Sequence, residues 1–354
     1  MKKKNLLRKT VMAEIKDCLP KPGTDEYIAM LKRQKEIREK EIKERLARIE
    51  RLSTKEKEET ELLNLSGCNL KSITEIKGLE DFTNLAELNL VGNKITEIKG
   101  LDSLVNLRTL RLADNQITEI KGLENLTKLN RLEFGDEEFW DPRYHHGNNI
   151  TKIKGLDSLT NLTQLDMTNN PIKEISGLEH LKNLRFLSLL GSEIREVKTL
   201  ESLENLTHLH LINTKISEIK GLENLKNLQY LDLSQNRISE IKGLDNLKPL
   251  RDLRLSSNRI TEIKGLEALT NLFSLSLDNN LITEIKGLET LQNLIQIELS
   301  NNKIENISNS SVFKNNQKLS TIFFLNSGMS PENIKKFETL LNPRKIELVY
   351  NWNL

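Results

Sequence analysis

With 354 residues, 29% of them charged, and a formal net charge of +2, the chain carries no global field that would favour nucleic acid or an acidic membrane surface. Aromatic residues make up only 4%, so the position of each one is informative. The two cysteines, Cys18 and Cys68, form no CxxC pair, which argues against a disulfide framework or a zinc site and favours a reducing compartment.

The chain starts with a basic segment that has no apolar core. Charged residues such as Arg8, Glu14 and Asp17 interrupt "MKKKNLLRKTVMAEIKDCLPKPG", so this start does not have the pattern of a signal peptide. No apolar run in the chain approaches the roughly 18 residues of a membrane span. We therefore expect a cytoplasmic protein without a membrane span.

The first 61 residues predict a basic helical extension. Apolar side chains recur along one side of residues 24–52, which predicts a long helix, and "STKE" at 53–56 is a capping box that predicts a second, short helix. Residues 1–60 contain 18 Lys or Arg against 12 Asp or Glu, a net charge of +6. We predict that residues 1–61 cap the segment that follows them. The alternative is that the long helix reaches outward to a partner helix or an acidic surface, and the sequence leaves both open.

From residue 62 onwards the chain repeats with a period of 22 residues. The unit reads LxxLxLxxNxIxxIxxLxxL, and Ser192 and Thr214 replace its asparagine in two repeats. The asparagine position holds Asn93, Asn115, Asn148, Asn170, Asn236, Asn258, Asn280 and Asn302.

This unit resembles the repeat of leucine-rich-repeat proteins of the 22-residue class, such as the leucine-rich regulatory subunit of protein phosphatase 1 and the bacterial internalins. The resemblance covers about residues 62–326. It implies an α/β repeat solenoid, a curved array with a parallel β-sheet of about 12–13 strands on its concave side and 3-10 or irregular structure on its convex side. It also implies a scaffold that binds proteins and, through the phosphatase subunit, a regulatory subunit of a signalling enzyme.

The residues themselves agree with such an array. Leucines that alternate with polar residues, such as Leu110 and Leu112, suit a strand with one buried face. The asparagine amide can satisfy backbone groups where the chain leaves the sheet, and one repeat cannot bury its own apolar face without its neighbours. The recurrent "EIKG" places a column of glutamates beside a column of lysines, which predicts a solvated, self-neutralised surface.

Residues 327–354 predict a C-terminal cap built from a helix and a strand. "SPENIKKFETLL" starts with a serine that can cap a helix and has Pro331 in its first turn. "KIELVYN" follows with the spacing of one more strand, which we expect to close the sheet.

The strand positions that point away from the core change character in the middle of the array. Apolar and aromatic side chains cluster on three adjacent strands, whereas most other outward positions are polar. Exposed apolar residues gathered in one place indicate an interaction surface, and tyrosine is a frequent interface anchor. We predict that a partner protein binds here, through Phe186, Leu190, His208, His210, Ile212, Tyr230, Asp232 and Arg254.

The stretch "GDEEFWDPRYHHG" at 135–147 interrupts the period, because the interval from Asn115 to Asn148 is 33 residues instead of 22. Insertions in repeat proteins map to loops, which often bind ligands. We predict that this insertion leans over the concave face and forms one wall of the binding site. The alternative is a local plug that packs onto the scaffold, and the sequence leaves it open. The partner-binding residues predicted in the insertion are Phe139, Trp140, Tyr144 and His145.

Catalysis and metal binding find little support in the sequence. Ser188, His210 and Asp232 fall in one column, but parallel side chains on a flat sheet form no oxyanion hole. The adjacent histidines His145 and His146 lack the HxxxH spacing of a metal site, and no glycine-rich phosphate-binding loop is present. We expect no enzyme activity, no cofactor and no metal.

Nucleic acid is the second class of partner. Some proteins of this repeat class occur in RNA–protein particles, so RNA binding through the basic N-terminal helix and the concave arginines is the alternative function. Acidic residues alternate with those arginines, which weakens it. We expect a monomer whose partner is another protein.

Overall fold

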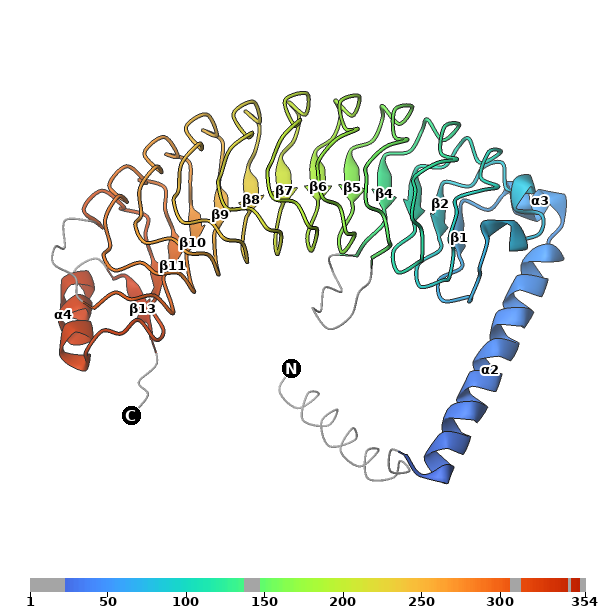
Figure 1. Ribbon diagram of the computed structural model, residues 1–354, viewed down its shortest axis with the longest axis horizontal. Helices are drawn as coiled ribbons and strands as arrows, with labels where there is room; N and C mark the ends of the chain where they lie inside the picture. The colour runs from blue at the N-terminus through green and yellow to red at the C-terminus, as the bar shows by residue number, and fades with distance from the viewer. Residues whose placement is uncertain (1–22, 137–146, 306–312, 343–344, 351–354) are drawn as a thin grey trace. The chain divides into compact units, whose positions relative to one another are not determined.

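The computed structural model describes residues 23–136, 147–305, 313–342 and 345–350. The chain divides into two compact units, residues 1–53 with 76–78 and residues 54–75 with 79–354. Among the described residues, the first unit contains one long helix and the second contains the repeats (Figure 1).

Helix α2 (Asp25–Glu50) confirms the predicted long helix. It begins at a threonine cap, because the side chain of Thr24 accepts a hydrogen bond from the amide of Tyr27 at 3.2 Å, and Asp25 and Glu26 lie in its first turn. Its role as a cap or as a partner-binding helix stays a prediction. None of the helices in the described part of the chain combines the length and the apolar composition needed to cross a membrane.

The second unit starts with the short helix α3 (Thr54–Glu58) and continues into a parallel sheet of thirteen strands that follow one another in chain order (Figure 1). Two 3-10 helices, η1 (Ile73–Glu75) and η2 (Leu79–Asp81), lie between β1 and β2 in chain order. The strands are β1 (Leu62–Asn64), β2 (Glu87–Asn89), β3 (Thr109–Arg111), β4 (Arg131–Glu133), β5 (Gln164–Asp166), β6 (Phe186–Ser188), β7 (His208–His210), β8 (Tyr230–Asp232), β9 (Asp252–Arg254), β10 (Ser274–Ser276), β11 (Gln296–Glu298), β12 (Thr321–Phe323) and β13 (Glu347–Val349). The predicted solenoid with a parallel sheet is confirmed.

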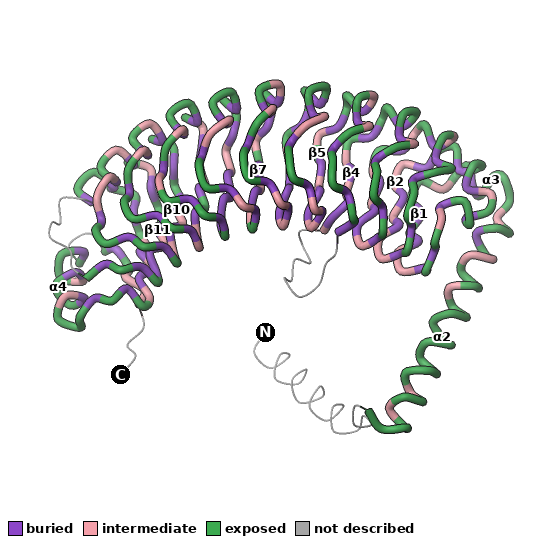
Figure 2. Tube along the Cα trace, viewed as in Figure 1, coloured by how far each residue is buried: buried purple, intermediate pink, exposed green. Residues whose placement is uncertain are grey.

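The core is a stack of leucines and isoleucines from successive repeats. The middle residue of each strand faces it; Leu231, for example, is fully buried and lies in register with Leu209 and Leu253 of the neighbouring strands. Buried and exposed residues alternate along every repeat (Figure 2). Each repeat therefore buries its apolar face only against the repeats before and after it.

The asparagines form the predicted ladder. The side-chain amide of Asn258 donates to the carbonyls of Leu233 and Leu255 at 2.9 and 3.1 Å, and its oxygen accepts from the amide of Ile238 at 2.9 Å. The two substituted positions behave differently. Thr214 donates to the carbonyl of its own repeat, whereas the buried hydroxyl of Ser192 has no hydrogen-bond partner. The ladder is therefore interrupted at Ser192.

The glutamate and lysine columns neutralise each other as predicted. The ammonium group of Lys242 lies 2.9 Å from the carboxylate of Glu218 in the preceding repeat, and Lys264 lies 3.0 Å from Glu240 in the same way. All four side chains are about half exposed, so water and salt screen these pairs and they add little to stability. These columns are part of the scaffold surface.

The C-terminal cap has the predicted helix and strand. Helix α4 (Pro331–Leu341) begins at Ser330, whose hydroxyl accepts from the amide of Asn333 at 3.2 Å. Its Phe337 packs edge-on against Phe324, with the ring centroids 5.8 Å apart. Strand β13 pairs with β12 and is the last strand of the sheet.

Candidate functional site

Strands β6, β7 and β8 bring four aromatic rings together on the sheet face that points away from the core. Phe186, His208 and Tyr230 occupy the same register position of these strands. The ring centroid of His210 lies 5.0 Å from that of Phe186 and 4.7 Å from that of Tyr230. His208 and Tyr230 stack with their centroids 5.8 Å apart. We call these four residues the aromatic cluster.

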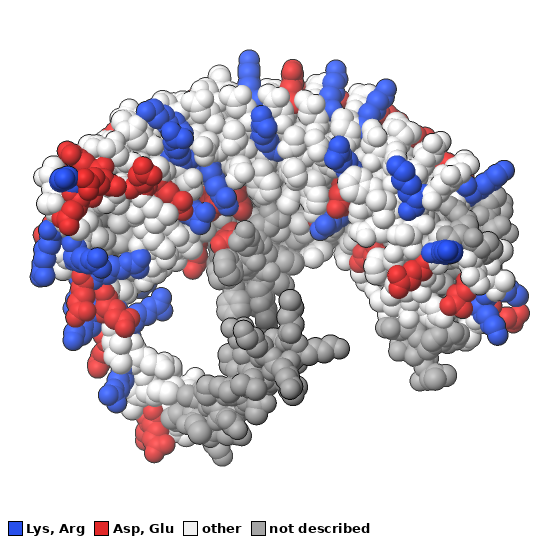
Figure 3. Space-filling model, turned by 180° about the vertical axis from the view of Figure 1, so that it is seen from behind, with Lys and Arg blue, Asp and Glu red and all other residues white. Residues whose placement is uncertain are grey.

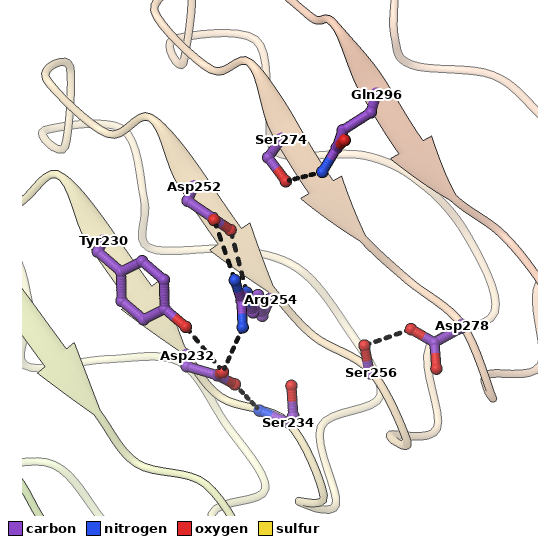
Figure 4. A network of polar contacts seen from close by, with 9 residues as sticks. All are labelled: Tyr230, Asp232, Ser234, Asp252, Arg254, Ser256, Ser274, Asp278 and Gln296. Atoms are coloured by element: carbon purple, nitrogen blue, oxygen red, sulfur yellow. Dashed lines mark hydrogen bonds and ion pairs between the residues drawn. The ribbon is translucent and has the colours of Figure 1, made fainter. Parts of the chain in front are cut away.

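Charged groups of β8 and β9 hold the ring of Tyr230 in place (Figure 4). The Tyr230 hydroxyl donates to Oδ2 of Asp232 at 3.2 Å, and the amide of Ser234 donates to Oδ1 at 2.9 Å. The guanidinium carbon of Arg254 lies 5.0 Å from the ring centroid of Tyr230. Arg254 also lies 4.0 Å from Asp232 and 3.4 Å from Asp252, so one cation contacts the ring and both carboxylates.

Burial sets the protonation of this site. It raises the pKa of the Asp232 carboxyl, against the hydrogen bonds from Ser234 and the charge of Arg254, which lower it. Burial and then the charge of Asp232 raise the pKa of the Tyr230 hydroxyl far above its ordinary value, so this hydroxyl stays a hydrogen-bond donor. Burial and then His210 lower the pKa of His208, whose ring is therefore neutral at pH 7.

Comparisons with known proteins agree with this architecture. The sequence profile of the family described as "Leucine Rich repeats (2 copies)" matches residues 145–180, 204–246, 226–268 and 250–290. An internalin of Listeria monocytogenes, inlF, is 29% identical and has a TM-score of 0.71, and the match covers 85% of this chain and 84% of that one. The chain belongs to the leucine-rich-repeat family.

Other solved leucine-rich-repeat structures share the fold at lower identity. The functional domain of InlJ from Listeria monocytogenes, which includes a cysteine ladder, is 22% identical with a TM-score of 0.58, and the match covers 85% of this chain and 65% of that one. A plant peptide hormone receptor, RGFR1, solved in complex with RGF2, is 22% identical with a TM-score of 0.59, over 82% of this chain and 47% of that one. No curated protein matches the sequence.

Two of the predicted partner-binding residues are buried in the leucine-rich-repeat array. Leu190 is only 2% exposed, so its predicted place on the surface is wrong. Its position follows the end of a strand, where the chain turns against the neighbouring repeats, and Thr168 in the same column is fully buried too. Asp232 is 4% exposed, so little of its side chain is available to a partner. Its contacts with the Tyr230 hydroxyl and the Arg254 guanidinium group orient those two side chains instead. Ile212 is half-buried beside them.

The predicted insertion residues Phe139, Trp140, Tyr144 and His145 lie outside the described residues. The two ends of the insertion are described, and both are buried glycines. A Cβ on Gly135 would lie 2.1 Å from the carbonyl oxygen of Thr168, and one on Gly147 would lie 2.0 Å from that of Asn169. Only glycine fits at either end, because both ends press against the backbone of the next repeat.

The column of Ser188, His210 and Asp232 does not form a catalytic set in the structure. The hydroxyl of Ser188 is fully buried and bonds to that of Thr168 at 3.0 Å, so it does not form the nucleophile of a Ser–His–Asp set with His210 and Asp232. Within the same described part of the chain, no three His, Cys, Asp or Glu side chains come together as a metal site would require.

Sequence reasoning missed a second asparagine ladder at the amino-terminal edge of the sheet. Each of its side-chain amides donates to a carbonyl of the preceding repeat, as Asn227 does to Glu204 at 2.8 Å. The signal for it was a recurrent "NL", whose asparagine stands three residues before most strands at the same 22-residue period. Its members are Asn84, Asn106, Asn161, Asn183, Asn205, Asn227, Asn271 and Asn293.

Proposed function

We propose that this leucine-rich-repeat protein is a non-catalytic scaffold that binds another protein on the concave face of its array, over β6 to β9. The observation that carries the proposal is the aromatic cluster, which interrupts a face whose other outward positions are mostly polar or charged. Aromatic residues at the centre of a contact surface, with arginine beside them, are the types that dominate binding energy in interfaces. Leucine-rich-repeat proteins such as the internalins are protein-interaction scaffolds.

Contacts within the chain hold Tyr230 in place before any partner binds, which supports the proposal. Tyr230 is held from one side by Asp232 and from the other by the guanidinium group of Arg254. A side chain that is already fixed loses little conformational entropy on binding, so more of its contact energy goes into affinity. Phe186 and His210 are half-buried, and His208 is partly buried and partly exposed, which leaves ring surface for a partner to cover.

The insertion at 135–147 forms a second wall of the proposed site. This part of the proposal rests on the sequence of the insertion alone. A role as the regulatory subunit of a signalling enzyme rests on the resemblance to the phosphatase subunit. The cytoplasmic location rests on the cysteine usage, and the monomeric state is part of the same proposal.

RNA binding is disfavoured, because acidic groups already pair with the arginines of the concave face. Arg111 lies 3.7 Å from Glu87 and 3.4 Å from Glu133, and Arg131 pairs with Glu133 as well. On the face drawn in Figure 3, basic and acidic side chains are interspersed along the array. A nucleic-acid site needs cations that are free to contact phosphates.

Affinity purification with matched variants tests the proposal. The wild-type chain, the double variant Phe186→Ala/Tyr230→Ala and the control Thr109→Ala, which alters the same register position on β3, are each used as bait in native extract. We expect one or more proteins to be retained by the wild type and the control and lost by the double variant, with folding checked by circular dichroism. Equal retention by all three baits would exclude the aromatic cluster as the binding site.

A further inference from the structure

A groove lies at the amino-terminal edge of the sheet, before strands β8 to β12 and separate from the aromatic cluster. Its volume is about 390 Å³. It is formed by two rows of side chains from successive repeats, one directly before the strands and one in the second asparagine ladder. The lining residues are Gln229, Pro249, Arg251, Asn271, Phe273, Asn293, Ile295 and Lys318.

The repeat pattern changes at this groove. The residue directly before the strand is polar for each of β3 to β9; examples are Arg108, Thr207 and Gln229. Before β10 and β11 the residue at this position is apolar. There Phe273 and Ile295 are neighbours, since the amide of Ile295 donates to the carbonyl of Phe273 at 2.9 Å. Their side chains are 38% and 42% exposed. The array thus presents two adjacent apolar side chains to solvent without burying them in its own core.

Proline changes the second row at the same place. Pro249 occupies a position of the second asparagine ladder, so it has no side-chain amide to donate to the preceding repeat. Asn271 and Asn293 on the following repeats keep their bonds to the carbonyls of Lys248 and Thr270. In the repeat of Pro249, Asn246 makes the bond to the preceding repeat instead, by donating to the carbonyl of Glu223 at 3.2 Å. The position that lines the groove is therefore free to carry the apolar ring of Pro249.

The charged residues of the groove have one sign. Arg251 and Lys318 line it, and no Asp or Glu is among its lining residues. The ammonium group of Lys318 donates to the side-chain oxygen of Asn293, a neutral partner, at 2.7 Å, and Lys318 has no ion pair with a carboxylate in the described part of the chain. An apolar floor between two cations is complementary to an apolar side chain flanked by carboxylates.

We propose that this groove binds an extended acidic segment of a partner protein, with an apolar side chain on Phe273 and Ile295 and carboxylates at Arg251 and Lys318. The groove crosses the spacing of four strand-to-strand steps, about 19 Å, which corresponds to about five or six residues of extended chain. The side-chain amides of Gln229 and Asn271 supply hydrogen-bonding groups for the backbone of such a segment. This surface adds a second contact to the concave site and does not depend on it.

Selection from a displayed library of random 12-residue peptides tests the proposal on the full chain. We expect enrichment of peptides in which an apolar residue stands next to Asp or Glu, and loss of their binding to the double variant Phe273→Ser/Ile295→Ser. Val105→Ser, which alters an exposed apolar residue near β3, is the matched control and should bind as the wild type does. Because the changed residues are exposed, the melting temperature of both variants should stay within about 2 °C of wild type.

A selected peptide then tests the charges by fluorescence anisotropy. Arg251→Gln and Lys318→Gln should each weaken binding about five- to tenfold, because each removes one charge-assisted contact. Tyr230→Ala should leave the affinity unchanged, which separates this groove from the concave site. The proposal is overturned if no peptide is enriched, if the enriched peptides lack acidic residues, or if they bind the Phe273→Ser/Ile295→Ser variant as well as the wild type.

Discussion

The guanidinium group of Arg254 lies over the ring of Tyr230, 5.0 Å from its centroid. The same group lies 3.4 Å from the carboxylate of Asp252, which belongs to β9 like Arg254 itself. Arg254 therefore belongs to the candidate site itself. The buried Asp232 completes the arrangement, because its carboxylate accepts a hydrogen bond from the Tyr230 hydroxyl and lies 4.0 Å from the same guanidinium group. A cation–π contact and a buried acceptor together fix the aromatic residue that we propose as the anchor for a partner.

Replacing Asp232 tests how much this arrangement contributes to stability. Asp232→Ala leaves the Tyr230 hydroxyl and the Ser234 amide without their acceptor, so we expect a loss of about 1–3 kcal/mol in the free energy of unfolding. Asp232→Asn keeps an acceptor for Ser234 and removes the buried charge, so its loss should be smaller. Urea denaturation gives both values. Equal losses for the two variants would show that the charge, and not the acceptor, is what matters.

The interrupted ladder predicts a stabilising substitution. The hydroxyl of Ser192 is buried without a partner, whereas asparagine at the same position of other repeats makes several backbone bonds. Ser192→Asn should raise the free energy of unfolding by about 1 kcal/mol, and Ser192→Ala should change it by less than about 0.5 kcal/mol. Thermal and chemical denaturation measure both. A destabilised Ser192→Asn would mean that the neighbouring repeats leave no room for the larger amide.

The glycines at the ends of the insertion predict two costly substitutions. Gly135→Ala and Gly147→Ala each place a methyl group about 2 Å from a backbone oxygen, so the next repeat must shift, and we expect losses of about 2–4 kcal/mol. Gly92 is the control, because its added Cβ would find only ordinary contacts; its positive φ alone costs about 1 kcal/mol in Gly92→Ala. If the Gly135 and Gly147 variants are no less stable than Gly92→Ala, the ends of the insertion are not clamped as described.

Deleting residues 136–146 distinguishes the two hypotheses about the insertion. The deletion joins Gly135 to Gly147 and restores the 22-residue period. If the insertion is a binding loop, the shortened protein should keep its melting temperature and retain less of the partner in affinity purification. If the insertion is a plug that packs on the scaffold, the melting temperature should fall instead.

The depressed pKa of His208 predicts a dependence of stability on pH. The unfolded chain takes up a proton near the ordinary histidine pKa of 6.5, whereas folded His208 does so only at lower pH, because burial disfavours its charged form. Below pH 6.5 the unfolded state therefore binds more protons, and stability falls as the pH falls. His208→Gln should lose less stability than the wild type between pH 7.5 and pH 5.5. Equal losses of stability in the variant and the wild type would mean that other titratable groups cause the pH dependence.

The sequence by itself determined the scaffold of this protein. Its 22-residue period places a leucine or isoleucine at most core positions and an asparagine at most turns. Each repeat packs only on its two neighbours, so sequence spacing translates directly into position along the array. The strands, the ladder, the helix that starts at Thr24 and the C-terminal helix that starts at Ser330 followed from local signals of this kind.

Only the tertiary structure decided which side chains reach solvent. Leu190 and Asp232 stand in outward columns of the sequence, yet neighbouring repeats cover both. The contact of Arg254 with Tyr230 and the groove beside Phe273 depend on side-chain rotamers and on the packing between adjacent repeats, which a periodic pattern does not encode. The period indicates which repeat a residue belongs to, whereas the burial and the contacts of its side chain result from how the repeats pack in three dimensions.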